Sequence, residues 1–115
     1  MRLVLALIQP TKLKAVQEAL AKIGVERMTV CDALGFGQQR GRSADIPASG
    51  RPALLRKVAL EIAVNEDFLD KTVETITHVA RTSSRGAMGD GKIFVLPIEE
   101  VIRLSDTIRG PEAVS

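Results

Sequence analysis

The first half of the chain carries the apolar pattern of a strand, a helix and a second strand. Residues 3–8 form a continuous apolar run, which is typical of a buried strand. Residues 13–23 repeat apolar positions at helical spacing, with Thr11 as the expected N-cap and Gly24 as the expected end. Residues 27–34 alternate loosely and include β-branched side chains, so a second strand is predicted there.

The second half of the chain repeats this order of elements. Residues 57–64 alternate between an apolar face and a mixed face, as expected of a strand with one buried side. Asn65 is the expected N-cap of a second helix. The apolar stripe of that helix consists of Leu69, Val73, Ile76 and Ala80. A fourth strand is predicted over residues 92–96, and residues 99–104 predict a short helix or turn.

Two strand–helix–strand units in 115 residues predict a single α+β domain over residues 1–115. The expected architecture is a ferredoxin-like βαββαβ sandwich, in which a four-stranded antiparallel sheet carries both helices on one face. The other face then shows Ala59, Glu61, Ala63 and apolar neighbours to solvent, which indicates oligomerisation. Many unrelated activities share this fold, so function has to be inferred from particular residues.

A long segment between the two units, residues 35–56, breaks every periodic pattern. It holds four glycines, two prolines and four arginines against a single acid. Loops of this length are uncommon in compact domains and are usually functional or disordered. Residues 37–56 are therefore interpreted as a flexible functional loop between strands two and three. The tail, residues 105–115, is expected to be loosely held.

Composition removes several classes of function. Tyr and Trp are absent, and three scattered Phe residues give no stacking platform for nucleic acid. No apolar run approaches the roughly 20 residues that cross a bilayer, so membrane insertion is not expected. A cytoplasmic location is expected instead. One cysteine excludes an internal disulfide. His78, the only histidine, is interpreted as a surface residue, and without a nucleophile–base pair no enzyme activity is expected.

The most specific chemistry lies in Gly89-Asp90-Gly91-Lys92, which leads directly into an apolar strand. Glycine accepts positive φ, and consecutive backbone N–H groups in such a turn form a concave anion site. Lys92 adds a positive charge, so the motif predicts phosphate binding. An ordinary hairpin turn is the alternative, because Asp-Gly is a general turn signal. A second glycine stretch, residues 35–37, also follows an apolar strand and favours the phosphate interpretation.

Several motifs together resemble the PII signal-transduction proteins, a family of nitrogen-status regulators, over nearly the whole chain. The matching residues are Gln9-Pro10-x-Lys12-Leu13, Met28-Thr29-Val30, Gly35-Phe36-Gly37-x-Gln39-x-Gly41, Ala80-Arg81-Thr82, Gly89-Asp90-Gly91-Lys92-Ile93-Phe94-Val95 and Pro97-x-Glu99-Glu100. The resemblance implies a homotrimer with ATP or ADP bound in the clefts between subunits. It also implies that the loop over residues 37–56 engages a membrane transporter or a metabolic enzyme.

The resemblance also assigns roles to individual residues. Phosphate contacts are expected from Gly89, Asp90, Gly91, Lys92 and Arg103. The adenine end is expected at Thr29 and Glu61, and the lining of the site at Leu7, Gly35, Phe36, Gly37 and Gln38. Gln39 is expected to help hold Mg²⁺, whose preferred ligands are oxygen atoms, together with the ATP phosphates and 2-oxoglutarate. Lys57 is expected to pair with a carboxylate of 2-oxoglutarate.

Departures from the family pattern concern the loops and the arginines. The absence of tyrosine excludes modification of a loop tyrosine. Gln38 stands where a basic residue is usual, and the loop before Gly89 is about three residues longer. Ser105 stands where a second arginine is usual, with Arg109 as the alternative that could substitute for it. Fewer arginines favour ADP or AMP over ATP. Two alternatives stay open: a sensor of another signal, linked to bicarbonate or metal efflux, and a metal-tolerance trimer of similar fold.

Overall fold

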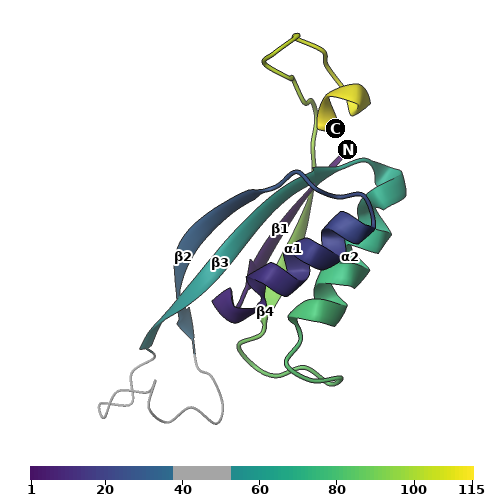
Figure 1. Ribbon diagram of the computed structural model, residues 1–115. Coiled ribbons are helices and arrows are strands. Elements are labelled where there is room, and N and C mark those ends of the chain that lie inside the picture. Colours follow the sequence, from purple (N-terminus) through teal and green to yellow (C-terminus); the bar gives the residue numbers. More distant parts are fainter. Residues whose placement is uncertain (38–52) are drawn as a thin grey trace.

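The structure, a computed structural model, describes residues 1–37 and 53–115; Gln38 and Gln39 of the predicted site lie outside these ranges. The elements follow in the order β1 (Arg2–Ile8), η1 (Pro10–Lys12), α1 (Leu13–Lys22), β2 (Thr29–Gly37), β3 (Ala53–Val64), α2 (Glu66–Ala80), β4 (Gly91–Pro97) and η3 (Pro111–Val114). This βαββαβ order confirms the predicted ferredoxin-like α+β fold (Figure 1).

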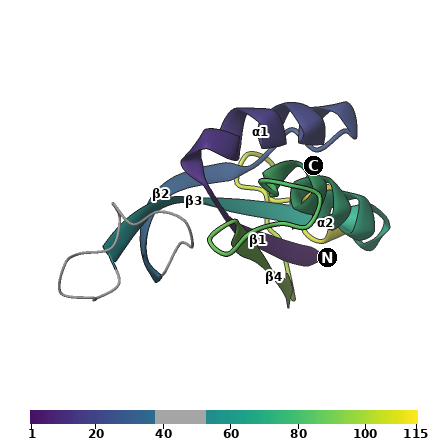
Figure 2. The same ribbon diagram turned by 90° about the horizontal axis from the view of Figure 1, so that it is seen from below.

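The four strands form one antiparallel sheet in the order β2-β3-β1-β4. β1 lies between β3 and β4, which explains why its sequence is apolar at almost every position. Figure 2 shows α1 and α2 on the same side of the sheet, so the opposite side is left open in the single chain. The sheet therefore has a covered face and an open face.

The core lies between the covered face and the two helices. Val58, Leu60, Ile62 and Val64 of β3 are buried, as their alternation predicted. They pack in one cluster with Val4, Ala6 and Ile8 of β1, Val16 and Leu20 of α1, and Ile76 and Ala80 of α2. Val16 and Leu20 are fully buried, and burial of each such side chain contributes about 1.5–3 kcal/mol. The predicted helical stripes therefore face the sheet.

The open face carries apolar side chains that remain accessible. Phe94 pairs with Leu5 and Leu96 pairs with Leu3 across β1 and β4. Because alternate residues of a strand point to opposite faces, these four lie opposite the core. Phe94 is 45% exposed and Leu96 is 42% exposed in the single chain.

The helix ends agree with the sequence at two of three predicted positions, Gly24 and Asn65. Gly24 ends α1 with φ +89°, and the N–H groups of Gly24 and Val25 bond to the Ala21 and Leu20 carbonyls, a Schellman motif. The prediction of Thr11 as N-cap is wrong. Pro10 starts the tight turn η1, which contains Thr11, and α1 begins only after it.

Asn65 occupies the N-cap position of α2 as predicted, but its side chain has a different use. Its Nδ2 donates to the Pro111 carbonyl at 3.2 Å instead of capping the helix. The side chain therefore connects the start of α2 to η3, near the end of the chain.

The segment predicted as loop over residues 35–56 is strand at both ends. β2 continues to Gly37, and β3 starts at Ala53, with Gly35 opposite Leu55 and Phe36 opposite Leu54. Backbone pairing between two antiparallel strands needs no buried side chain, which is why the broken apolar pattern did not reveal it. In Figure 1 the β2–β3 ribbon projects beyond the other strands.

Residues 98–115, here called the C-terminal arm, project past the end of the sheet (Figure 1). Ile102 and Arg109 form an isolated antiparallel bridge, and residues 104–106 form a turn, so the alternative of a helix over residues 99–104 is wrong. The Gly110 N–H bonds to the Val101 carbonyl at 2.9 Å, and Ala113 is buried. Loose attachment of the tail stays a prediction.

Candidate functional site

The Gly89-Asp90-Gly91-Lys92 motif forms the junction between the loop after α2 and the start of β4. Gly89 has φ +97° and Gly91 has φ +119°, conformations that residues with side chains rarely adopt. At Gly91 a Cβ atom would lie 1.7 Å from the Leu7 carbonyl oxygen. The backbone of β1 therefore excludes any side chain at Gly91, whether or not a ligand binds.

The carbonyl oxygen of Gly89 ties this turn to the sheet. Gln9 Nε2 donates to it at 3.2 Å from just beyond β1, and Lys57 Nζ donates to it from β3. Lys57 also lies beside the second glycine stretch, because a Cβ at Gly35 would be 3.8 Å from Lys57 Cγ. One lysine side chain thus connects the two glycine stretches within a single chain.

Asp90 organises the loop of residues 82–90 from inside. Its Oδ2 accepts hydrogen bonds from the backbone N–H of Ala87 at 2.7 Å and of Thr82 at 3.2 Å. Burial raises the pKa of this carboxyl, but these hydrogen bonds and the positive charge of Lys12 outweigh burial and hold the pKa below its usual range. Asp90 is therefore ionised at neutral pH and fixes the shape of the loop.

The other carboxylate oxygen of Asp90 has a different environment. Asp90 Oδ1 is buried and has no hydrogen-bond partner within the part of the chain that the structure describes. Such an atom is uncommon in a folded protein, because a buried acceptor without a partner costs free energy.

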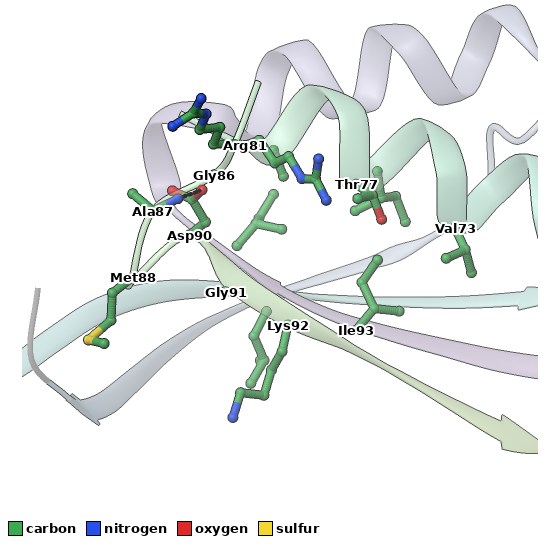
Figure 3. Close-up of a pocket in the computed structure, with 15 residues that line it drawn as sticks. Val73, Thr77, Arg81, Gly86, Ala87, Met88, Asp90, Gly91, Lys92 and Ile93 are labelled. Atoms are coloured by element: carbon green, nitrogen blue, oxygen red, sulfur yellow. Dashed lines mark hydrogen bonds between the residues drawn. The ribbon is translucent and has the colours of Figure 1, made fainter. Parts of the chain in front are cut away.

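A pocket of about 540 Å³ lies between α2, the loop after it and the start of β4 (Figure 3). Its size falls in the range of small-molecule sites, roughly 300–1,000 Å³. Apolar side chains of α2, β1 and β4 form much of the wall. The charged residues of the lining are Arg81, Arg85, Asp90 and Lys92, although the Lys92 side chain lies on the other side of β4 (Figure 3). This excess of positive charge suits an anionic ligand.

Lys92 leaves the turn on the open face of the sheet. Figure 3 shows its side chain on the side of β4 opposite to Val73 and Thr77 of α2, whereas Ile93 points toward that helix. Lys92 pairs with Leu7 of β1, so both predicted site residues share the open face.

The predicted adenine-end residues lie on the same face. Thr29 and Glu61 are cross-strand partners, and Glu61 also pairs with Leu5 of β1. Leu5 and Leu7 are alternate residues of one strand and therefore point the same way. The sheet thus collects Leu7, Thr29, Glu61 and Lys92 on its open face.

Residues 35–37, the start of the segment without periodic pattern, belong to β2 and are paired strand. Gly35, Phe36 and Gly37 pair with Leu55, Leu54 and Ala53 of β3. Phe36 is 78% exposed. Gly35 is connected to the Gly89 turn through Lys57.

Arg103, which was predicted to contact phosphate, lies far from the Gly89 turn within a single chain. It lies in the C-terminal arm, at the opposite end of the sheet from the loop of residues 82–90 (Figure 1). Its guanidinium pairs with Asp106 at 2.7 Å. The hydrogen bond that Arg103 donates to Asp106 raises the pKa of Arg103, so the group is permanently charged.

Four residues of the site were missed by the sequence interpretation. Gln9 supports the turn, and Arg81, Arg85 and Met88 line the pocket. Arg81 also donates to the Ser84 carbonyl at 3.2 Å within the loop. Both arginines lie in the segment before Gly89, and Arg85 is among the residues added there, so the extra arginine was the available signal. A glutamine that ends a strand carries no such signal.

Two further findings bear on possible ligands and partners. Among residues 1–37 and 53–115, no group of three or more His, Cys, Asp or Glu side chains could hold a metal ion. Within the same ranges, no helix is long and apolar enough to pass through a bilayer.

Comparisons with known proteins agree with the fold and with these motifs. The family model "Nitrogen regulatory protein P-II" matches residues 1–107. Nitrogen regulatory protein GlnK1 of Methanosarcina mazei is 46% identical over 115 residues, covering 99% of this chain and 97% of that protein. Nitrogen regulatory protein P-II 1 of Escherichia coli is 43% identical over 104 residues, covering 86% and 87%.

A solved structure gives the same answer at the level of the fold. The crystal structure of Arabidopsis thaliana PII bound to citrate matches with a TM-score of 0.78 and 36% identity. The match covers 98% of this chain and 88% of that one. The chain therefore belongs to the nitrogen regulatory protein P-II family.

Proposed function

We propose that this chain is a regulatory sensor that binds an adenine nucleotide, ATP, ADP or AMP, in the clefts of a homotrimer. The observation that carries the proposal is the position of Lys92. Lys92 follows a turn whose shape is fixed by the close approach of Gly91 to β1 and by the hydrogen bonds to the Gly89 carbonyl. The Lys92 side chain lies on the open face beside Leu7. A fixed turn with an adjacent cation is the arrangement that binds phosphate.

The homotrimer is supported by the open face of the sheet. Phe94, Leu96, Leu3 and Leu5 form an apolar surface next to Lys92 and Glu61. An apolar surface with a charged border is typical of a protein–protein interface. Subunits that meet there would bring the predicted site residues of one chain to the edge of another.

A small carboxylate such as 2-oxoglutarate is the second proposed ligand, with Lys57 as its partner. Lys57 already donates to the Gly89 carbonyl, so a carboxylate bound at Lys57 would also act on the turn. The related Arabidopsis PII was solved bound to citrate, another carboxylate. Mg²⁺ would be held chiefly by phosphate oxygens, since no metal-binding cluster occurs in the described part of the chain.

The proposed output is control of a membrane transporter or a metabolic enzyme through the loop over residues 37–56. A ligand can change that loop only if it binds one loop state more tightly than another. Lys57 lies in β3, which leads out of the loop, and contacts the turn of the proposed nucleotide site.

Calorimetric titration of the whole chain with ATP, ADP, AMP and 2-oxoglutarate, with and without Mg²⁺, tests this function. Lys92→Ala should weaken nucleotide binding by about 1–3 kcal/mol, the scale of a charge-assisted hydrogen bond. The control is Lys71→Ala, which removes an exposed lysine from α2 and should leave affinity unchanged. Equal affinity for the wild-type chain and Lys92→Ala would remove Lys92 from the site.

Titrations with bicarbonate and with a divalent metal, each without nucleotide, separate the alternatives. Tight binding of bicarbonate or of a divalent metal without nucleotide would favour a sensor of another signal or a metal-tolerance trimer. Binding of nucleotide that depends on Lys92 would favour the sensor proposed here.

A further inference from the structure

Arg103 donates to its own arm through every nitrogen of its guanidinium. Nε lies 3.1 Å and 3.0 Å from the two carboxylate oxygens of Asp106, and one terminal nitrogen lies 2.7 Å from Asp106 Oδ2. The other terminal nitrogen donates to Ser115 O at 3.0 Å and to the Glu112 carbonyl at 3.4 Å. A guanidinium has five N–H donors, so these contacts use most of them.

The Arg103–Asp106 pair is close to neutral as a unit. The hydrogen bond from Arg103 and a second from the Ile108 N–H lower the pKa of Asp106, so its carboxylate stays charged at neutral pH. A phosphate that approaches Arg103 therefore meets an arginine whose charge is already balanced, with a carboxylate directly beside it.

The backbone around this pair is held in one conformation. Thr107 has φ +59°, an uncommon conformation for a β-branched residue. Its N–H donates to the Arg103 carbonyl at 2.8 Å, and its hydroxyl donates to the Asp106 carbonyl at 2.6 Å. Strained residues persist only where the surroundings hold them. The pair is thus built into the arm and is more than a chance contact of two exposed side chains.

We propose that Asp106 is a specificity-determining residue that makes the nucleotide site discriminate against the third phosphate. The inference rests on the proposed function and adds to it that the trimer brings Arg103, an expected phosphate contact, from one subunit to the Gly89 turn of its neighbour. Each added phosphate brings negative charge toward Asp106, while Arg103 has little uncompensated charge to offer. ADP and AMP therefore bind at least as tightly as ATP.

The test is calorimetric titration of ATP, ADP and AMP into the full-length wild-type chain and Asp106→Asn. Asparagine keeps an oxygen acceptor for the Ile108 N–H and removes only the charge. ATP should bind about tenfold more tightly to the variant, while AMP changes less than about twofold. The matched control is Glu100→Gln, which removes another carboxylate of the arm, paired with Arg109 at 2.6 Å, and should leave all three affinities unchanged.

A second variant keeps the test informative if Asp106→Asn disturbs the arm. Arg103→Ala leaves the carboxylate of Asp106 without its partner, so ATP binding should weaken more than AMP binding. Asp106→Glu keeps the charge and should keep the wild-type order of affinities. Thermal unfolding followed by circular dichroism checks that each variant is folded.

The outcomes separate this inference from the proposed function. An ATP-to-ADP affinity ratio that is the same in the wild-type chain and Asp106→Asn would overturn the role of Asp106. So would a wild-type chain that binds ATP more than about tenfold tighter than ADP. If no nucleotide binds at all, the proposed function itself fails, and the inference fails with it. Nucleotide binding that Lys92→Ala weakens and Asp106→Asn leaves unchanged refutes only the inference.

Discussion

At the scale of single residues, the glycine and the lysine of the Gly91-Lys92 pair have separate physical causes. Gly91 is fixed by the chain itself, because a Cβ there would meet the Leu7 carbonyl. Lys92 has no such structural reason to be lysine, since its side chain lies on the open face. Packing thus explains the glycine, whereas ligand binding is the proposed explanation for the lysine.

Gly91→Ala should be among the most destabilising small substitutions in this chain. The positive φ and the contact with β1 together should lower the free energy of unfolding by about 3 kcal/mol or more. Gly24→Ala is the matched control: its φ is also positive, but a Cβ meets only Phe68 Cε1 at 3.8 Å, so about 1 kcal/mol is expected. Urea unfolding of both variants checks this, and equal losses would contradict the backbone contact.

At the scale of elements, the sequence predicted the regular parts well because their signal is periodic. The stripes of both helices and the alternation of residues 57–64 follow burial, so they identified α1, α2 and most of β3. The ends of β2 and β3 near residues 37 and 53 were missed, because backbone pairing leaves no apolar pattern there.

The candidate site was predictable only where its residues lie in a motif. The glycine turn was found from its own sequence, and the fold places Lys92, Leu7, Thr29 and Glu61 on one face. The bonds from Gln9 and Lys57 to the Gly89 carbonyl join positions far apart in the chain, and no local pattern encodes them. Whether these residues bind nucleotide stays a prediction.

The loop of residues 82–90 depends on one carboxylate, which predicts a pH dependence. The pKa of Asp90 is lowered in the folded chain, so its stabilising effect is present above about pH 4 and is lost as pH falls through the lowered value. Asp90→Asn should therefore be less stable than the wild-type chain at neutral pH.

Thermal unfolding of both chains at neutral pH and at about pH 2 measures this effect. The difference between their unfolding midpoints should shrink at the acidic pH, because Asp90 loses charge as the pH falls toward and through its lowered pKa. A difference that is the same at both values would show that the hydrogen bonds of Asp90 to Ala87 and Thr82 do not depend on its charge.

At the scale of the whole molecule, only one face of the sheet is covered by a hydrophobic core, whereas the other face exposes apolar side chains. The covered face is closed by α1 and α2, whereas Phe94 and Leu96 remain accessible on the open face. The proposed trimer would cover that face and would place the C-terminal arm of one chain near the turn of another.

Phe94→Glu should prevent the proposed assembly. A carboxylate in the middle of an apolar interface has no partner there and disfavours burial. Size-exclusion chromatography with light scattering should show three times the chain mass of 12.4 kDa for the wild-type chain and a single chain for the variant. Phe68→Glu changes an exposed phenylalanine on α2 and should leave the trimer intact. A wild-type chain that is monomeric at all concentrations would contradict the trimer.

The bond from Lys57 to the Gly89 carbonyl has a mechanical consequence. Lys57 lies in β3, the longest strand that the structure describes, and β3 is paired with β2 along the ribbon. A force on the Lys57 side chain would therefore act on both strands. Because β2 and β3 are paired from Thr29 opposite Glu61 to Gly37 opposite Ala53, a shift of Lys57 at the glycine turn is expected to move both strands together. The strand ends at Gly37 and Ala53 would move with it, and the chain between residues 37 and 53 is attached there.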